Sequence, residues 1–159
     1  MSKKKICMVG DFSVGKTSLT QKFVNNVFSD KYLTTIGVKI DTATINDTKL
    51  IVWDVAGRDS LSPINASYLV GAAGVVLVAD GTRPSTLEGL LENWQTVVDR
   101  IGEVPVVVAI NKADMDEWSV DELTVLEFKA KGWDVFYTSA KEGEKVAELF
   151  NCLESKLVS

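Results

Sequence analysis

Histidine is absent from this chain of 159 residues, and cysteine occurs only at Cys7 and Cys152. The lack of histidine excludes imidazole acid–base catalysis, histidine metal sites and Ser-His-Asp triads. Two isolated cysteines give neither a metal-binding spacing nor a disulfide framework, which is typical of a reducing cytoplasm. No apolar run approaches the ~18 residues that span a bilayer. We therefore expect a soluble cytoplasmic protein.

Basic charge is also scarce. The chain has 17 Lys and Arg against 22 Asp and Glu, and hence a net charge of −5. Its only basic run is residues 3–5, before the first expected strand, and is typical of a solvated terminus. Binding to nucleic acid requires clustered Lys and Arg at the phosphates. The composition therefore argues against a nucleic-acid partner.

Apolar strand-like runs alternate with helical patterns. The expected strands cover residues 4–9, 38–45, 49–54, 74–79, 104–110 and 134–137. The expected helices cover residues 16–26, 63–70, 86–101, 119–131 and 141–157. This alternation predicts an α/β fold with a mainly parallel sheet and helices on both faces. A hairpin signal at residues 46–48 makes the second and third strands antiparallel, so we expect six strands, one of them antiparallel to the rest.

Two helix starts can be placed more closely. Pro84-Ser85 precedes the third expected helix, and Ser119 is followed three residues later by Glu122, the spacing of a capping box. No internal repeat and no linker rich in Pro or Ser interrupts the pattern. We therefore expect a single domain over residues 1–159.

An eight-residue run, GDFSVGKT at residues 10–17, fits the phosphate-binding pattern G-x-x-x-x-G-K-[ST] without a mismatch. A glycine-rich turn entering a helix aims backbone N–H groups and the positive end of the helix dipole at one spot. Lys16 would place its charge on the β- and γ-phosphates, and Thr17 would offer a hydroxyl to Mg²⁺. A plain strand–turn–helix connection, the alternative, does not require this Lys-Thr pair. Further expected contacts to the nucleotide are Ser13, Val14, Gly15 and Ser18.

The choice of base follows from the segment Asn111-Lys112-Ala113-Asp114, which comes directly after an apolar strand. Ligands bind at the carboxyl ends of parallel strands, and there Asp114 can accept hydrogen bonds from N1–H and N2–H₂ of guanine. Adenine has only an acceptor at N1 and would leave the carboxylate unpaired. Asn111 and Lys112 would support the base and the phosphate loop. The rival, a P-loop nucleotide or metabolite kinase, would need an arginine-rich lid and an acceptor site, which the sequence does not show.

With these motifs the chain resembles the Ras superfamily of small GTPases, and within it the Rab-like branch most closely. The resemblance covers the whole chain and includes residues 10–17, 32–38, 53–59, 111–114 and 138–141 in the family's order and spacing. It implies a G domain of the P-loop NTPase class that binds GTP and GDP with Mg²⁺. It also implies a monomeric molecular switch whose partners are exchange factors, GTPase activators and effectors.

The resemblance also implies roles for single residues near the γ-phosphate. Thr35 is similar to the switch I threonine that binds Mg²⁺ and senses the γ-phosphate, and the Gly57 amide would bind that phosphate. Asp54 resembles the acid that holds Mg²⁺ through water. Loops 30–37 and 57–70 would be ordered by these contacts and relax on hydrolysis.

Other assignments concern the guanine base. Phe28 resembles the aromatic residue that stacks on guanine, with a core phenylalanine as the alternative. Ser139, Ala140 and Lys141 would complete the base pocket, with the Ala140 N–H donating to guanine O6.

The sequence departs from the family at Arg58, where the usual residue is a Gln that orients the attacking water. One interpretation is a lost catalytic residue and slow hydrolysis. In a second, Arg58 acts as an internal arginine finger, and in a third it binds a partner. Phe12, where Ras has Gly, adds bulk to the phosphate loop. We expect slow hydrolysis; the alternative is a permanently GTP-bound scaffold without turnover.

A second departure concerns membrane attachment. Ras and Rab relatives usually end in a flexible tail with a prenylated Cys, whereas this sequence ends at Ser159, directly after the last expected helix. Either the sequence is truncated or the protein is not lipidated. Cys152 falls inside the helix, where we expect it to pack. We therefore expect no lipid anchor in this sequence, which would suit a prokaryotic Ras-like protein.

Overall fold

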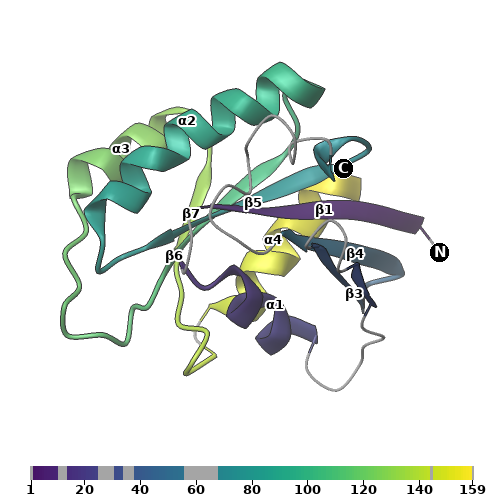
Figure 1. Cartoon of the computed structure of the whole chain (residues 1–159), viewed down its shortest axis with the longest axis horizontal. Helices are drawn as coiled ribbons and strands as arrows, with labels where there is room; N and C mark the ends of the chain where they lie inside the picture. Colours follow the sequence, from purple (N-terminus) through teal and green to yellow (C-terminus); the bar gives the residue numbers. More distant parts are fainter. Residues whose placement is uncertain are drawn as a thin grey trace.

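A twisted sheet of seven strands forms the centre of the described structure, with helices on both of its faces (Figure 1). The computed structural model describes residues 2–10, 14–24, 31–33, 38–55, 68–143 and 145–158. The strands in these ranges are β1 (Ser2–Gly10), β2 (Lys31–Leu33), β3 (Val38–Ile45), β4 (Thr48–Val55), β5 (Gly74–Asp80), β6 (Val106–Asn111) and β7 (Asp134–Tyr137). The helices are α1 (Lys16–Val24), α2 (Pro84–Ile101), α3 (Glu122–Ala130) and α4 (Val146–Val158).

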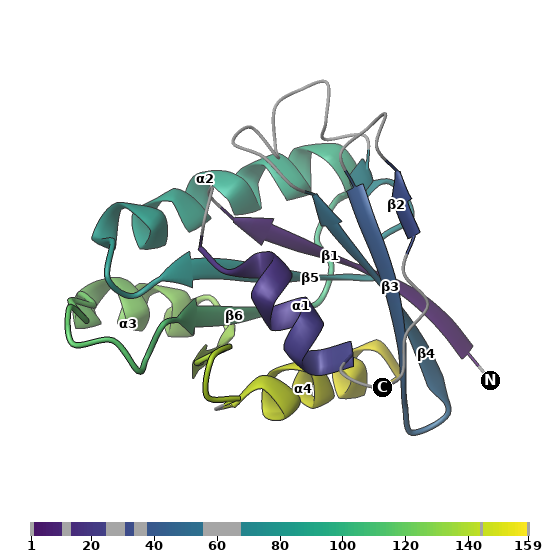
Figure 2. The same ribbon diagram turned by 60° about the horizontal axis from the view of Figure 1, so that its bottom comes forward.

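The sheet has the order β2-β3-β4-β1-β5-β6-β7. The pairs from β4 through β1 and β5 to β7 are parallel, and β3 pairs antiparallel with both β2 and β4. β3 alone therefore runs against the other strands. The predicted fold class is confirmed, and each of the six expected strands is present. The structure adds β2, a three-residue edge strand beside β3 (Figure 2).

Two hydrophobic layers, one on each face of the sheet, explain why the central strands are continuously apolar. In β1, Cys7 and Val9 join a core with α2 and α3, whereas Ile6 and Met8 join a core with α1 and α4. β5 and β6 are buried at every position for the same reason. Each fully buried Val, Leu, Ile or Met side chain in these strands contributes roughly 1.5–3 kcal/mol. Both faces of the sheet are therefore fixed by hydrophobic packing.

The hairpin between β3 and β4 has the turn that the sequence predicts. Asn46 and Asp47 both have positive φ, at 47° and 66°, as a two-residue turn of type I′ requires. The buried carboxylate of Glu154 in α4 accepts hydrogen bonds from Asn46 Nδ2 at 3.3 Å and from Thr48 Oγ1 at 3.0 Å. The last helix thus holds the hairpin in place.

Three helix starts differ from the sequence prediction. α2 begins at Pro84, two residues early, because Pro fits the first turn of a helix and Arg83 precedes it without a side-chain cap. The expected cap at Ser119 is wrong: the N-cap of α3 is Asp121, whose carboxylate accepts from the Leu123 N–H at 3.0 Å. α4 begins at Val146, five residues late, because residues 139–143 close a tight loop instead.

The expected helix over residues 63–70 falls mostly outside the described residues. Tyr68 and Leu69, which are described, form a short 3₁₀ turn with buried side chains. The expected end of the first helix at residues 25–26 also falls outside the described ranges. Among the helices that are described, none has the length and apolar character needed to cross a membrane.

Replacing Asp121 by Ala should lower the free energy of unfolding by about 1 kcal/mol, because the cap of α3 loses its acceptor. Urea unfolding at a fixed nucleotide concentration measures the change. Ser119→Ala is the matched control and should have less than about 0.3 kcal/mol of effect. A larger loss in the Ser119 variant than in the Asp121 variant would restore the sequence-based assignment.

Candidate functional site

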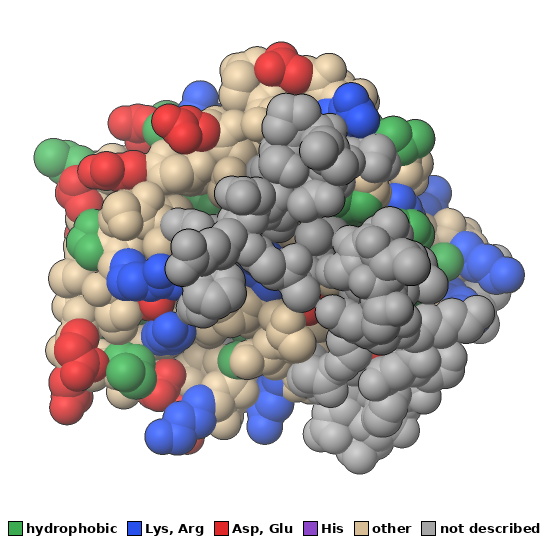
Figure 3. All heavy atoms as spheres, viewed as in Figure 1, with side chains coloured by type: hydrophobic (Ala, Val, Ile, Leu, Met, Phe, Trp, Pro, Cys, Tyr) green, Lys and Arg blue, Asp and Glu red, His purple; other side chains and the backbone are tan. Residues whose placement is uncertain are grey.

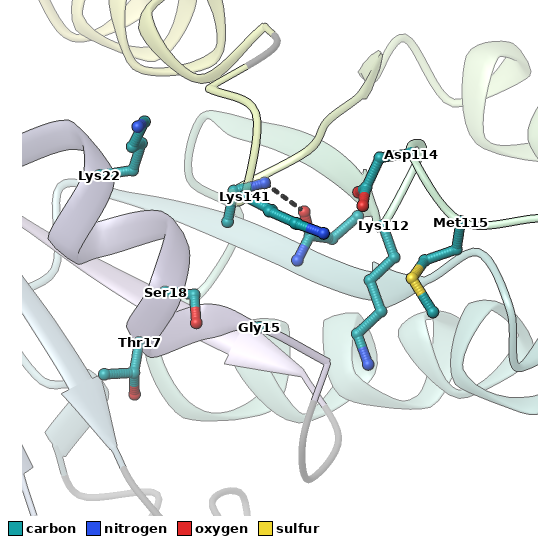
Figure 4. Close-up of a pocket in the computed structure, with 10 residues that line it drawn as sticks. Gly15, Thr17, Ser18, Lys22, Lys112, Asp114, Met115 and Lys141 are labelled. Carbon is teal, nitrogen blue, oxygen red and sulfur yellow. Dashed lines mark hydrogen bonds between the residues drawn. The ribbon is translucent and has the colours of Figure 1, made fainter.

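An open pocket of about 750 Å³ lies where the carboxyl ends of β1, β6 and β7 meet the start of α1 (Figure 4). Open α/β sheets bind ligands at this edge. Thr17, Ser18 and Lys22 stand on the α1 side, and Lys112, Asp114 and Met115 stand opposite them. The residues that line the pocket are Gly15, Thr17, Ser18, Lys22, Asn111, Lys112, Asp114, Met115, Ala140 and Lys141.

Eight of these ten residues are sequence-predicted contacts, and Lys22 and Met115 are additions. Lys22 follows Ser18 by four residues on the same face of α1, a spacing that could have revealed it. A Cβ built at Gly143 would lie 3.0 Å from Lys22 Cε, so the lysine stem passes close over the loop after β7. Five predicted site residues lie outside the described residues: Ser13, Phe28, Thr35, Gly57 and Arg58.

The phosphate loop approaches the base loop closely at Gly15. This glycine has φ +105°, and a Cβ placed on it would lie 2.1 Å from Asn111 Nδ2. Any larger residue would therefore be strained and would also collide with Asn111. The second Gly of the motif is needed here for contact between two loops.

Asn111 is the side chain that joins the loops. It is buried at the end of β6, and its Nδ2 donates to the Val14 carbonyl at 3.1 Å. Its Oδ1 accepts from Thr138 Oγ1 and from the Ala140 N–H, both at 3.2 Å. One carboxamide thus connects the phosphate loop to the segment after β7. Because the Ala140 N–H is directed at Asn111, its donation to guanine O6 stays a prediction.

Asp114 is held from the neighbouring loop. Its Oδ1 accepts from Ser139 Oγ at 2.7 Å, and Ser139 Oγ in turn accepts from the Glu142 N–H at 3.0 Å. Ser139 is fully buried, whereas Asp114 is exposed on the pocket wall. The serine therefore fixes the direction of a carboxylate that faces the pocket.

At the phosphate end, Lys16 is buried and its Nζ donates to the Gly10 carbonyl at 3.0 Å. This contact turns the ammonium group toward the end of β1. An ammonium group in this position suits a ligand with several anionic oxygens.

A candidate metal site lies next to Lys16. Thr17 Oγ1 donates to Asp54 Oδ2 at 2.5 Å, which brings a hydroxyl from α1 to a buried carboxylate near the end of β4. Hydroxyl and carboxylate oxygens are ligands that Mg²⁺ prefers, and it normally takes only one or two carboxylates together with phosphate oxygens. The described residues contain no cluster of three or more His, Cys, Asp or Glu that could form a site of protein ligands alone. The donor set therefore fits Mg²⁺ bound jointly with a phosphate.

The pocket is locally basic in an acidic protein. Among the described residues, three lysines and one carboxylate are the charged groups that line it, whereas acidic side chains gather near α2 and α3 on the surface seen in Figure 3. Asp80, buried at the end of β5, pairs with Lys112 Nζ at 2.9 Å and with Arg83 Nε at 3.0 Å. Burial alone would raise the pKa of Asp80, but hydrogen bonds from Thr82, Lys112 and Arg83 lower it to about 2. Asp80 is therefore ionised at neutral pH.

A glycine-rich loop entering α1 and a base loop after β6, on a parallel sheet with helices on both faces, define a nucleotide site of the P-loop class. The family model described as "Ras family" matches residues 5–159. The chain belongs to the Ras family.

Among curated proteins, the chain is similar to several Ras-related proteins. It is 36% identical over 162 residues to Rab-18 of Caenorhabditis briggsae, covering 97% of this chain and 80% of the relative. It is 35% identical over 161 residues to SEC4 of Saccharomyces cerevisiae, covering 97% of this chain and 74% of the relative. It is 33% identical over 165 residues to Rab-1 of Theileria annulata, covering 96% of this chain and 73% of the relative. These eukaryotic relatives support the Rab-like resemblance and give no support to a prokaryotic origin.

Replacing Gly15 by Ala should abolish tight nucleotide binding, because the new Cβ would displace Asn111 from Val14. We expect an affinity loss of about 100-fold or more, since a buried amide then loses its partner in a strained loop. Titration with a fluorescent GDP analogue measures it.

The matched control is Gly89→Ala in α2, where a built Cβ meets no atom within 4 Å. That variant should bind normally and gain about 0.5–1 kcal/mol of stability. Normal binding by the Gly15 variant would contradict the close approach of the two loops.

Proposed function

We propose that this protein is a guanine-nucleotide switch that binds GTP and GDP with Mg²⁺ and hydrolyses GTP slowly. The observation that carries this proposal is the Asn111 carboxamide of the base loop, which joins the phosphate loop at Val14 to the segment after β7 at Ala140. A phosphate-binding turn and a guanine-type base loop therefore share one pocket. Membership of the Ras family supports the same function.

At the phosphate end of the pocket, the proposed role of the protein is to stabilise the negative charge of the phosphates. Lys16 holds the β- and γ-phosphates and stabilises the charge that develops on them during hydrolysis. Thr17 and Asp54 would hold Mg²⁺, which when bound would neutralise phosphate charge. Thr35 and the Gly57 amide, by resemblance to the family, complete the metal shell and bind the γ-phosphate.

At the base end of the pocket, the proposed role of the protein is to select guanine over other bases. Asp114 accepts from N1–H and N2–H₂ of guanine, and Ser139 keeps its carboxylate in direction through a 2.7 Å hydrogen bond. Adenine would leave a carboxylate without donors, and an unpaired charge in a binding site is costly. Ala140, Lys141 and Phe28 complete the base pocket in this proposal.

The output of the proposed switch is a change in two loops, residues 30–37 and 57–70, between the GTP and GDP states. Exchange factors, GTPase activators and effectors are the partners that a Ras-family switch requires. We further propose a single G domain over residues 1–159, a monomeric state and a cytoplasmic location.

The alternative function is a scaffold that holds GTP permanently, and Arg58 together with Phe12 favours it. The nucleotide that remains on the purified protein separates the two functions. Mostly GDP supports a switch with turnover, whereas mostly GTP supports the scaffold.

Replacing Asp114 by Asn should lower GDP affinity by about 100-fold or more, because an amide replaces the acceptor for two guanine donors. Affinity for XDP should rise, since the new NH₂ can donate to the C2 carbonyl of xanthine. Competition binding with both nucleotides measures the shift. Asp116→Asn, an exposed change on the same loop, is the control and should bind GDP normally. Unaltered guanine preference in the Asp114 variant would overturn the assigned base pocket.

Single-turnover hydrolysis of preloaded GTP with Mg²⁺, in Arg58→Gln and Arg58→Ala, separates the interpretations of Arg58. We expect Gln to accelerate hydrolysis and Ala to leave it unchanged, because the usual water-positioning residue is missing. A loss with Ala, on the order of 10³-fold, would instead identify an arginine finger acting in cis.

If neither Arg58 variant changes the rate, both catalytic interpretations are excluded and the third, contact with a partner, is left. Arg100→Gln, an exposed change in the last turn of α2, serves as the charge-matched control.

A further inference from the structure

Asp80 is a buried carboxylate beside the candidate site that the proposed function does not use. It is the last residue of β5 and lies in register with Asn111, the last residue of β6. Its exposed fraction is 1%. Both residues therefore stand at the sheet edge where the pocket opens, and only Asn111 lines the pocket.

Both oxygens of the Asp80 carboxylate have polar partners. Oδ1 accepts from the Thr82 N–H at 2.8 Å and from Thr82 Oγ1 at 2.6 Å. Oδ2 is contacted by Lys112 Nζ at 2.9 Å and by Arg83 Nε at 3.0 Å. A buried carboxylate with this many donors keeps its charge and holds its partners firmly.

The two cations on Oδ2 differ in where they stand. Lys112 lines the pocket, whereas Arg83 is not among the lining residues. Figure 4 shows the Lys112 side chain extended away from Asp114, along the wall of the pocket. A lysine has a long flexible stem, so a fixed anion at its end selects one path for that stem. Asp80 thereby sets the shape of one wall.

The backbone ties the same two segments together. The Gly81 N–H donates to the Asn111 carbonyl at 2.9 Å, and the Ser119 N–H donates to the Gly81 carbonyl at 2.8 Å. Lys112 has φ +70°, a left-handed conformation that is strained for a non-glycine residue. From this conformation the Lys112 side chain reaches Asp80.

We propose that Asp80 is a positioning residue for guanine-nucleotide binding, which acts by holding Lys112 against the bound nucleotide. This inference rests on the proposed function. It predicts that loss of the Asp80 charge shortens the lifetime of the nucleotide complex through Lys112.

The test is the dissociation rate of a fluorescent GDP analogue from the full chain with Mg²⁺. Asp80→Asn should release it about 10-fold faster, because a charged hydrogen bond becomes a neutral one. Arg83→Met is the matched control, since it removes the other cation from the same oxygen at nearly the same distance. It should stay within about twofold of the original rate.

Coupling between Asp80 and Lys112 separates positioning from a general structural effect. Lys112→Met should itself speed release, and adding Asp80→Asn to it should change the rate by less than about twofold. An equal effect of Asp80→Asn with and without Lys112 would overturn the proposal, as would an unchanged rate in the single variant.

A second measurement, an NMR signal from the Lys112 ammonium group, tests the proposal without the Asp80→Asn variant, in case that variant does not fold. In the unmodified GDP complex, an ammonium group held in an ion pair exchanges its protons slowly enough for a ¹H–¹⁵N lysine signal. We expect such a signal, identified by its loss in Lys112→Met, and its absence would overturn the proposal. Failure of the unmodified protein to retain GDP at all would instead reject the proposed function.

Discussion

The site depends on one buried carboxamide. Asn111 donates to the loop after β1 and accepts from the segment after β7, so three pieces of the sheet edge share a single side chain. Neutral hydrogen bonds contribute only about 1 kcal/mol each, but a buried partner left without one costs more. Loss of either loop's contact with Asn111 would therefore destabilise the other, and Gly15 is small because this contact leaves no room for a Cβ.

Polar residues at the ends of apolar strands organise the rest of the pocket edge. β4, β5 and β6 reach this edge with Asp54, Asp80 and Asn111, and each of these side chains is buried. Hydrophobic packing on both faces fixes the positions of the strands. The strands in turn fix where each polar group lies along the pocket edge. Thr17 at the start of α1, Val14 in the loop before it and Lys112 directly after β6 then meet these groups. The rigid part of the fold thus supplies the acceptors and donors against which the loops are set.

The fold class could be predicted because each signal was local. Positive φ at Asn46 and Asp47 follows from residue types that tolerate it, and apolar runs gave the central strands. The three-residue strand β2 carries too short a pattern to be seen. The late start of α4 was equally hidden, because residues 139–143 close around Ser139, whose partner Asp114 lies in another loop. Long-range hydrogen bonds leave no periodicity in the sequence.

The candidate site was predictable where a motif fixes residue types at fixed spacing. That is why Gly15, Thr17, Asn111 and Asp114 were expected and do line one pocket. Asp80 was not predicted as a site residue, because the sequence alone does not show that an acid at the end of this strand pairs with Lys112.

The contact between Glu154 and the β3–β4 turn has a mechanical consequence. A slide of this hairpin by one residue along β1 would turn its buried face outward, and a slide by two, about 7 Å, would preserve the faces. The longer slide would still pull Asn46 and Thr48 away from a buried carboxylate, at a cost of several kcal/mol. The contact with Glu154 therefore fixes the turn end of the hairpin. The other end of the hairpin can bend, but the register of β4 on β1 is held.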